Sequence, residues 1–269
     1  MEATKKNKPI ALITGASRGI GWDLAHLFAK DGYNLVVVAR TQKAMEELAG
    51  DLQESHGTSV HILVKDLTDP LAPEEIYREL TQKKIAVEVL VNNAGFGTYG
   101  PFAQTDLKKE LDLLQVNIAA LTHLTKLFLR DMISRGQGKI LNLASVAGFQ
   151  PGPFMAVYYA SKAYVLHFSE ALANELKGTG VTVTALCPGP TRTGFENEAK
   201  LEKSGLFKNL SVMDSRTVAR IGYEGMKKGK TIVIPGLSNK LIVQLTRIGP
   251  REVVTQSVRM IQAGRRGGK

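Results

Sequence analysis

Short runs of consecutive apolar residues alternate along the chain with longer segments whose apolar residues recur every three or four positions. The short runs are rich in β-branched residues and predict strands at 10–13, 35–38, 60–64, 87–91, 140–143, 181–187 and 231–234. The longer segments predict helices at 20–30, 42–55, 73–83, 108–134, 158–177 and 215–228. Because most of the short runs are continuously apolar, we expect an α/β fold with about seven parallel strands, buried on both faces and covered by helices.

Two stretches depart from this alternation. Residues 190–213 lack a strand pattern and mix large apolar residues with charged ones, and we expect them to form a lid over a substrate site. Residues 237–264 follow the last strand and predict two helical pieces separated by Gly249 and Pro250. With no internal repeat or linker in between, we expect a basic tail over 1–8, one catalytic domain over 9–236 and a basic helical extension over 237–269.

The composition indicates a globular protein from a reducing compartment. Of the 269 residues, 43% are hydrophobic and 22% are charged, which excludes a disordered or fibrous protein. The single cysteine, Cys187, excludes an internal disulfide and a cysteine-based zinc site. We therefore expect a cytoplasmic protein without a metal site. No apolar run reaches the roughly 20 residues that span a bilayer, and the run at 10–13 is too short for a signal peptide.

The net charge of +10 is concentrated at the two ends of the chain. Residues 1–8 carry +2 and residues 240–269 carry +6, so the body between them is nearly neutral. Basic ends attract anionic surfaces such as membranes and nucleic acids. Solvated termini are the favoured interpretation. We expect no nucleic-acid partner, and at most a weak association of the C-terminal tail with a membrane surface.

A glycine-rich turn joins the first predicted strand to the first predicted helix, with the spacing G-x-x-x-G-x-G. Such a turn lets the backbone approach a pyrophosphate, while the helix N-terminus supplies amide hydrogens and a positive dipole. The alternative is an ordinary turn with a helix cap. We expect a dinucleotide to contact this turn at Thr14, Gly15, Ser17, Arg18, Gly19, Ile20 and Gly21.

The end of the second strand bears on which dinucleotide binds. An NAD enzyme places Asp or Glu about 20 residues beyond the glycines, where it binds the ribose 2′-hydroxyl. Here Arg40 occupies that place, and Arg18 lies within the glycine turn. Two guanidiniums suit a 2′-phosphate, which predicts NADP(H). The alternative is that both arginines are merely solvated.

Polar and small residues end the third and fourth strands. Asp66, followed by Leu67, is placed to accept a hydrogen bond from an adenine amino group. In Asn92-Asn93-Ala94-Gly95, the small residues let a cofactor cross the strand ends. The carboxyl ends of strands are where open α/β sheets bind ligands. We therefore expect cofactor contacts at Asp66, Leu67, Asn93, Ala94 and Gly95.

A tyrosine and a lysine one helical turn apart offer acid–base chemistry. Tyr158 and Lys162 share a helix face, thirteen residues beyond Ser145 at the end of the fifth strand. A nearby ammonium favours the phenolate, which predicts a lowered pKa for Tyr158. A phenol tuned in this way can act as a general acid toward a carbonyl oxygen. Ser145 is placed to donate a hydrogen bond to the same oxygen.

The same tyrosine–lysine spacing occurs a second time, at Tyr223 and Lys227. The spacing alone is a weak signal in a chain of this size. The second pair has no serine at a strand end thirteen residues before it. We therefore interpret Tyr223 and Lys227 as a structural contact and Tyr158 and Lys162 as the functional pair.

Two further motifs fit the same site. Asn117, a polar amide in an apolar stretch of the long fourth helix, is either a satisfied buried group or part of a proton relay. The sixth strand runs into a turn stiffened by two prolines and a glycine, whose threonine hydroxyls are able to bind a carboxamide; an ordinary strand exit is the alternative. The predicted cofactor contacts in this turn are Pro188, Gly189, Thr191 and Thr193.

Taken in this order, the motifs resemble those of the short-chain dehydrogenase/reductase superfamily, in its compact single-domain branch, over about residues 8–236. The resemblance implies a Rossmann-type doubly wound sheet and a catalytic tetrad of Asn117, Ser145, Tyr158 and Lys162. It implies that the nicotinamide hydride goes to a carbonyl carbon while Tyr158 gives the proton. Lys162 is then expected to tune Tyr158 and hold the nicotinamide ribose, and Asn117 to support a water relay. It also implies a homodimer or homotetramer, built on the helices at 108–134 and 157–177.

The tail beyond residue 236 departs from the shortest members of that superfamily and resembles the basic extensions of a bacterial-type subgroup of oxidoreductases. Its apolar residues are flanked by arginines. They predict a dimer patch, a wall of the substrate pocket or a helix on a membrane surface, in that order of preference.

Aromatic residues in three loops predict an apolar substrate. The expected rim comprises Phe96, Tyr99, Phe102, Phe149, Phe154, Met155 and Phe195. We expect NADPH-dependent reduction of a hydrophobic ketone or aldehyde, such as a 3-oxoacyl thioester, a steroid-like ketone or a xenobiotic carbonyl. The alternatives are an NAD-linked alcohol dehydrogenase of the same fold and a non-catalytic NADP-binding scaffold that docks through its basic ends.

Overall fold

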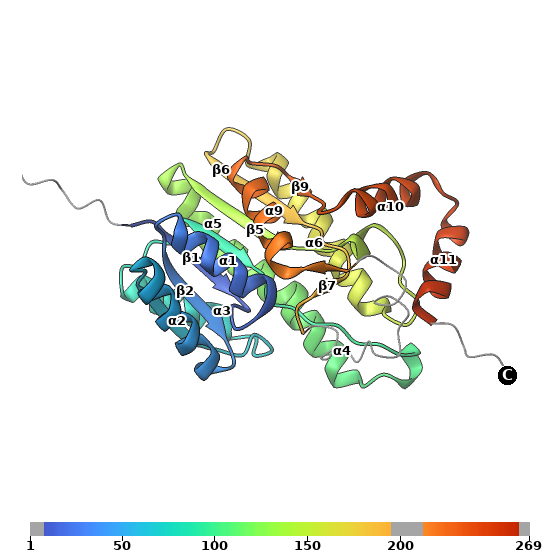
Figure 1. Ribbon diagram of the computed structural model, residues 1–269, viewed down its shortest axis with the longest axis horizontal. Coiled ribbons are helices and arrows are strands. Elements are labelled where there is room, and N and C mark those ends of the chain that lie inside the picture. Colours follow the sequence, from blue (N-terminus) through green and yellow to red (C-terminus); the bar gives the residue numbers. More distant parts are fainter. Residues whose placement is uncertain (1–7, 195–211, 264–269) are drawn as a thin grey trace, which may run out of the picture.

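The computed structural model describes residues 8–194 and 212–263, and within them the predicted parallel sheet is confirmed (Figure 1). Seven strands pair in the order β3-β2-β1-β4-β5-β6-β9, all of them parallel. The strands are β1 (Ile10–Thr14), β2 (Asn34–Ala39), β3 (Val60–Val64), β4 (Val89–Asn92), β5 (Gly138–Leu143), β6 (Val181–Leu186) and β9 (Ile232–Val233).

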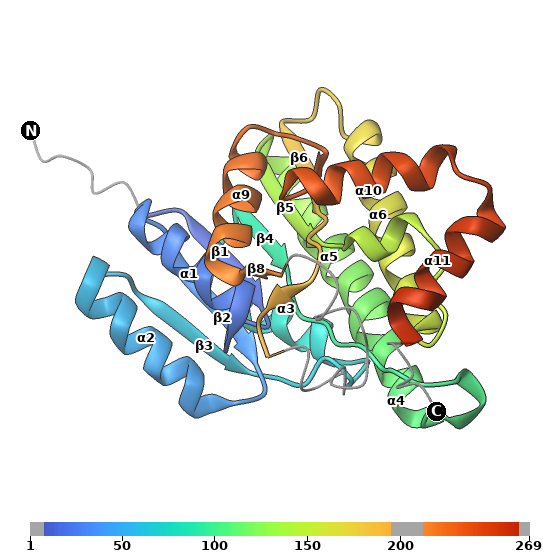
Figure 2. The same ribbon diagram turned by 45° about the vertical axis from the view of Figure 1, so that its right-hand side comes forward.

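Helices cover both faces of the sheet because successive strand residues point to opposite sides. On β1, Ala11 and Ile13 join one apolar core, and Leu12 joins the other. The first core is covered by α1 (Gly19–Lys30), α2 (Gln42–His56) and α9 (Ser215–Lys227). The second is covered by α3 (Ala72–Gln82), α5 (Leu121–Arg135) and the C-terminal half of α6 (Ala156–Glu175). These two layers are visible in Figures 1 and 2.

The long helix predicted over 108–134 is not one regular helix. It comprises α4 (Leu107–Leu114), a π-helical turn, η2 (Gln115–Ala120), and α5. The apolar spacing of α4 and α5 gives no sign of the extra residue in the turn, which is why the sequence predicted an uninterrupted element. Asn117 lies inside η2, and π-helical turns are frequent at functional sites.

Residues 190–213 also differ from the prediction of a strandless segment. Two short strands, β7 (Thr191–Arg192) and β8 (Met213–Asp214), pair there in parallel. The remaining part of the predicted lid, 195–211, lies outside the described residues. Short 3₁₀ turns, η1 (Phe102–Gln104) and η3 (Val146–Phe149), occupy the loops after β4 and β5.

The two helical pieces predicted after the sheet are present as α10 (Leu237–Ile248) and α11 (Arg251–Ala263). Figure 2 shows α10 leading away from the sheet and α11 turning back beside α6. Within residues 8–194 and 212–263, no helix is long and apolar enough to cross a membrane. On α10 the apolar side chains that remain exposed are Leu237, Leu241, Leu245 and Ile248.

Strand order fixes where a ligand can bind. The chain runs outward in one direction through β1, β2 and β3, and in the other through β4, β5 and β6. The crevice outside the carboxyl ends of β1 and β4 is therefore the topological switch point, where open α/β sheets bind ligands. Thr14 ends β1 and Asn92 ends β4, so both motifs predicted to bind a dinucleotide lie at this point.

Candidate active site

A single cavity of about 520 Å³ runs along the carboxyl ends of the strands and connects the predicted cofactor residues with the predicted catalytic ones. Sequence-predicted residues that line it are Gly15, Ser17, Arg18, Ile20, Arg40, Asp66, Leu67, Asn93, Ala94, Gly95, Phe96, Ser145, Met155, Tyr158, Lys162, Pro188, Gly189, Thr191 and Thr193. The elongated set, from Arg40 at one end to Tyr158 at the other, suits a dinucleotide rather than a compact ligand.

The glycine turn brings backbone to the cavity wall. Gly15 and Gly19 have φ values of +67° and +59°, a left-handed conformation that glycine adopts without strain. A Cβ on Gly21 would lie 2.4 Å from the carbonyl oxygen of Gly15, so the start of α1 packs directly against the turn. The N-cap residue of α1 is Arg18, and this end of the helix faces the cavity that Gly15, Ser17 and Arg18 line. The first amides of a helix have no partner within it, and such an end suits an anion such as a pyrophosphate.

Thr14, Gly19 and Gly21 support the cavity without lining it. The Thr14 hydroxyl accepts hydrogen bonds from the amides of Asn93 at 3.1 Å and Ala94 at 3.0 Å. The Asn93 side chain in turn donates to the carbonyl oxygens of Thr14 at 2.9 Å and Gly15 at 3.0 Å. These bonds join the carboxyl ends of β1 and β4 across the switch point. The sequence predicted Thr14 as a cofactor contact, whereas its position is that of a brace behind the contacts.

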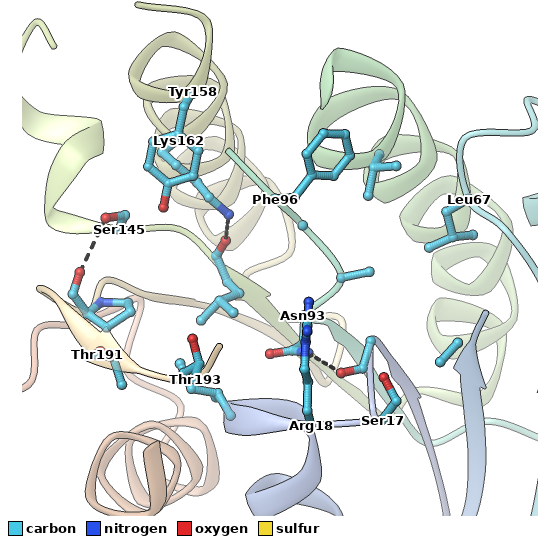
Figure 3. Close-up of a pocket in the computed structure, with 18 of the residues that line it drawn as sticks. Ser17, Arg18, Leu67, Asn93, Phe96, Ser145, Tyr158, Lys162, Thr191 and Thr193 are labelled. Atoms are coloured by element: carbon cyan, nitrogen blue, oxygen red, sulfur yellow. Dashed lines mark hydrogen bonds between the residues drawn. The ribbon is translucent and has the colours of Figure 1, made fainter. Parts of the chain in front are cut away.

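The adenosine end of the cavity carries the charged residues. Arg18 and Arg40 are both exposed and both line it. Asp66 also lines the cavity, and its carboxylate accepts a hydrogen bond from the Thr68 amide at 3.0 Å, which fixes its orientation. Figure 3 shows Arg18 beside Ser17 and Asn93 on the opposite side of the cavity from Tyr158. A 2′-phosphate and an adenine both find fitting partners at this end.

Tyr158, Lys162 and Ser145 converge at the other end. In Figure 3 the Tyr158 hydroxyl and the Lys162 amine both point down from α6, the hydroxyl on the side of Ser145 and the amine on the side away from it. Lys162 Nζ donates to the Leu143 carbonyl oxygen at 2.7 Å and lies 5.7 Å from the centre of the Tyr158 ring. Ser145 Oγ donates to the Pro188 carbonyl oxygen at 3.3 Å and accepts from the Ala147 amide at 3.1 Å.

Burial shifts both titrating groups toward their neutral forms. It raises the pKa of Tyr158 to about 12, with a hydrogen bond to Ser145 opposing the shift. It lowers the pKa of Lys162 to about 8. The lowered tyrosine pKa predicted from the spacing with Lys162 is therefore wrong for this structure, because burial raises the pKa and the hydrogen bond to Ser145 does not offset it. At neutral pH the phenol holds its proton and the lysine is mostly charged.

Asn117 is satisfied by hydrogen bonds and lies against the catalytic end. Its side chain donates to Ser161 Oγ at 3.0 Å and to the Phe96 carbonyl at 3.1 Å, and it accepts from the Phe96 amide at 3.2 Å. A Cβ on Gly95 would lie 2.9 Å from Asn117 Oδ1 and 3.5 Å from Lys162 Nζ. Glycine at 95 therefore keeps open the space that these two polar groups face.

The turn after β6 is braced by a residue that the sequence did not single out. Asn239, at the start of α10, is buried and donates to the Pro235 carbonyl at 2.7 Å. A Cβ on Gly189 would lie 2.4 Å from Asn239 Oδ1, so the two residues are in close contact. An asparagine in the first turn of a predicted helix was the only signal available. The tail thus supports the turn that carries Pro188 and Thr191.

The predicted substrate rim is only partly at the cavity. Phe96 and Met155 line it, together with Tyr159, which the sequence did not select. Phe149 is not among the lining residues, because it packs into a small core beside Val165 and Leu166. Phe154 is also not among the lining residues, and its ring lies beside Tyr99 and under Arg259. Neither phenylalanine lines this cavity, and their contact with a substrate stays a prediction. Phe195 lies outside the described residues.

Metal ligands do not gather anywhere in the described part of the chain. No group of three or more His, Cys, Asp or Glu side chains there is able to hold a metal ion. Cys187 is buried, and burial raises the pKa of its thiol to about 12, so it is a neutral core residue.

The short chain dehydrogenase family model matches residues 9–204, which include every glycine-turn and catalytic residue named above. The chain belongs to the short-chain dehydrogenase/reductase family. It is an oxidoreductase of that family, with the family's seven-stranded Rossmann-type sheet.

Solved structures of this family match nearly the whole chain. A short-chain dehydrogenase from Sphingobium yanoikuyae in complex with NADPH is 32% identical, with a TM-score of 0.80 over 96% of this chain and 100% of that one. A bulky-bulky ketone specific alcohol dehydrogenase from Comamonas testosteroni is also 32% identical, with a TM-score of 0.76 over 90% of this chain and 93% of that one.

Among the curated relatives, a very-long-chain 3-oxoacyl-CoA reductase from Pyrenophora tritici-repentis is 33% identical over 223 residues. The match covers 81% of this chain and 65% of the relative, so this chain spans less than two thirds of that protein.

Proposed function

We propose that this short-chain dehydrogenase/reductase reduces a hydrophobic ketone or aldehyde with NADPH, using Tyr158 as the general acid. The observation that carries the proposal is the convergence of Tyr158, Lys162 and Ser145 on one end of a cavity whose other end holds Arg18 and Arg40. The apolar wall of Phe96, Met155 and Tyr159 favours a hydrophobic substituent over a sugar. Names of relatives that act on ketones and 3-oxoacyl thioesters support the substrate class.

A bound nicotinamide dinucleotide would supply the hydride that adds to the carbonyl carbon. Ser145 donates a hydrogen bond to the carbonyl oxygen and orients it beside Tyr158. Tyr158 gives its hydroxyl proton to that oxygen as negative charge develops there, which yields the alcohol and leaves a phenolate. The charged Lys162, one turn along α6, stabilises that phenolate. Asn117 and Lys162 face the same space beside Gly95, which fits the water relay that would return the proton.

Arg18 and Arg40 are the residues that we expect to favour NADPH over NADH. Arg40 follows β2 and Arg18 lies in the glycine turn, and both line the same end of the cavity. Guanidiniums bind phosphate by short, charge-assisted hydrogen bonds. An Asp at position 40 would instead repel a 2′-phosphate and accept from a 2′-hydroxyl.

The test is NADPH consumption, measured by absorbance, against a panel of ketones, aldehydes and 3-oxoacyl thioesters, repeated with NADH. We expect turnover of apolar ketones with a preference for NADPH, and a loss of about tenfold or more in that preference in Arg40→Asp. Wild-type protein that prefers NADH would overturn the assignment of Arg18 and Arg40 and favour the NAD-linked alcohol dehydrogenase. No turnover together with salt-sensitive binding to anionic vesicles would favour the non-catalytic scaffold that docks through its basic ends.

We propose that the enzyme is a homodimer or homotetramer. Leu107, Leu111 and Leu114 form one stripe along α4, with exposures of 69%, 54% and 36%. Large exposed apolar stripes of this kind mark interaction surfaces. Light scattering of the purified protein gives the subunit number directly, and a monomer at micromolar concentration would contradict the proposal.

A further inference from the structure

The last helix, α11, packs behind the wall of the substrate end of the cavity. Of its side chains, Val258 and Gln262 are buried, at 5% and 0% exposure. Val258 joins a small apolar cluster with Ala147, Met155 and Tyr159, against which Tyr158 also packs. Figure 2 shows this helix lying beside α6. The tail therefore reaches the pocket wall from behind. A wall of the substrate pocket was one of the three roles predicted for the tail, but none of its described residues lines the cavity, and its contacts are with the residues that do.

Gln262 joins two elements of the pocket by hydrogen bonds. Its side-chain amide donates to the Tyr159 hydroxyl at 2.8 Å, across 103 residues of chain. Its main-chain carbonyl accepts from the Tyr99 hydroxyl at 2.8 Å. Tyr99 belongs to the loop after β4, and Tyr159 to the first turn of α6. One residue of the tail thus joins the loop after β4 to the start of α6.

Tyr159 is the wall residue that this bond holds. It lines the cavity next to Tyr158, the two rings meeting edge to face with 6.1 Å between centres. On its other side the ring rests on the backbone of Gly152, where an added Cβ would lie 2.1 Å from the ring. With Gly152 on one side and Gln262 at its hydroxyl, Tyr159 has little freedom to move.

Burying the Gln262 side-chain amide is unfavourable, and its hydrogen bond to Tyr159 gives a reason for an amide at this position. The side-chain oxygen, Oε1, has no hydrogen-bond partner among the residues described. A buried polar atom without a partner destabilises the folded protein, and a leucine at the same place would avoid this cost. The amide is therefore suited to holding the Tyr159 hydroxyl rather than to filling space.

We propose that Gln262 is a specificity-determining positioning residue that sets the width of the substrate end through Tyr159. This inference rests on the proposed ketone reduction. Without the Gln262 side chain, Tyr159 loses its hydrogen bond and gains room to move toward α11. The apolar space bordered by Tyr159, Met155 and Phe96 then widens, and bulkier substituents on the carbonyl carbon fit better. Small ketones, which do not reach this wall, are reduced as before.

The experiment compares Gln262→Ala with Gln256→Ala, an exposed glutamine on the same helix, and with Tyr159→Phe. For each protein, kcat and KM are measured with 2-butanone, acetophenone and benzophenone at saturating NADPH. In Gln262→Ala we expect the ratio of kcat/KM for benzophenone to that for 2-butanone to rise about tenfold, through KM. We expect a rise of about threefold in Tyr159→Phe and no change in Gln256→Ala. An unchanged ratio, or an equal loss with all three ketones, overturns the proposal.

A binding measurement separates this proposal from the proposed function. If the wild type turns over no ketone, the reductase assignment fails, and calorimetric titration with benzophenone still reports the width of the pocket. Tighter benzophenone binding by Gln262→Ala than by Gln256→Ala supports the role of Gln262. Equal binding by the two variants overturns it. Equal NADPH dissociation constants and cooperative thermal unfolding of both variants are expected as evidence that each is folded.

Discussion

The chain contains the same tyrosine–lysine spacing at two places that face different surroundings. In both, the helix places the amine over the ring, at 5.7 Å for Lys162 and Tyr158 and 5.2 Å for Lys227 and Tyr223. In the second pair, Asp31 accepts from the Tyr223 hydroxyl at 2.8 Å and from Lys227 at 2.7 Å. Neither of its members lines the cavity. The spacing therefore fixes the geometry of each tyrosine–lysine pair. The group that contacts the pair, Ser145 in the first and Asp31 in the second, determines its chemistry.

The group that contacts each pair also determines which of its members keeps a proton. The hydrogen bond from Lys227 lowers the pKa of Asp31, and the same bond raises the pKa of Lys227. Burial and the bond to Asp31 raise the pKa of Tyr223. The carboxylate thus compensates the ammonium and retains the phenol proton. Tyr158 contacts Ser145 instead, a neutral group that does not hold the tyrosine proton and that orients the substrate oxygen in the mechanism proposed above.

Removing each hydroxyl is expected to separate the two pairs most clearly. We expect Tyr158→Phe to lower kcat/KM for ketone reduction at least about 10³-fold, because no other group donates the proton. NADPH binding is expected to persist. Tyr223→Phe should keep activity within about twofold and lose about 1 kcal/mol of stability with the bond to Asp31. Steady-state kinetics and thermal unfolding of both variants measure this, and comparable activity losses in both would remove the distinction.

Replacing each lysine sharpens the distinction. Lys162→Met is expected to reduce kcat about 10²-fold, since the phenolate formed at Tyr158 would lose its stabilising charge. Lys227→Met should leave kcat unchanged, because it removes only a partly exposed ion pair, worth at most about 1 kcal/mol. Full activity in Lys162→Met would place the stabilising charge elsewhere in the site.

The pH dependence should follow the first lysine alone. Below its pKa of about 8, Lys162 is charged and stabilises the developing phenolate; above it, the neutral amine does not. Tyr158, with a pKa of about 12, stays protonated throughout. We therefore expect kcat/KM for reduction to be constant below pH about 8 and to fall about tenfold per pH unit above it. For oxidation of the alcohol, which consumes no proton, we expect kcat/KM to rise with pH. Lys227→Met serves as the control with an unchanged profile; a profile that shifts in this variant contradicts the assignment.

The smallest effect is expected at the carboxylate of the second pair. Asp31→Asn keeps an oxygen for the Tyr223 hydroxyl but removes the charge that Lys227 meets at 2.7 Å. Because this ion pair is exposed, we expect a loss of less than about 1 kcal/mol and a lower unfolding temperature by about 2 °C. Ketone reduction should be unaffected. A measurable fall in kcat would show that this region influences the catalytic end.

Most of the fold was predictable because its signals are local. Continuously apolar runs such as the one ending in Val38 identify parallel strands, and the glycines at 15, 19 and 21 mark the turn at the switch point. The π-helical turn around Asn117 was not predictable, because one extra residue per turn leaves the polar–apolar pattern intact. The strands at β7 and β8 were missed because two residues carry no periodicity.

The site was predictable where a motif identifies both the residue and the element on which it lies, as for Ser145 at a strand end and Tyr158 on a helix. It was not predictable where long-range packing decides. Phe149 packs against the cluster that contains Val165 and does not line the cavity. Gln262 meets Tyr159 across 103 residues, and no sequence pattern encodes that contact. The pKa of Tyr158 was predicted in the wrong direction because desolvation depends on the whole surrounding fold.

The single surplus residue in η2 (Gln115–Ala120) widens one turn between α4 and α5. A π-helical turn holds one residue more than an α-helical turn and so keeps the helices before and after it in line. Deleting one residue from this turn would therefore let α4 and α5 join as one regular helix, with α5 still anchored on the sheet through Leu124 and Phe128. The Asn117 amide would then lose the widened turn from which it reaches Phe96 and Ser161, so the contacts of this side chain depend on an irregularity that the fold itself does not need.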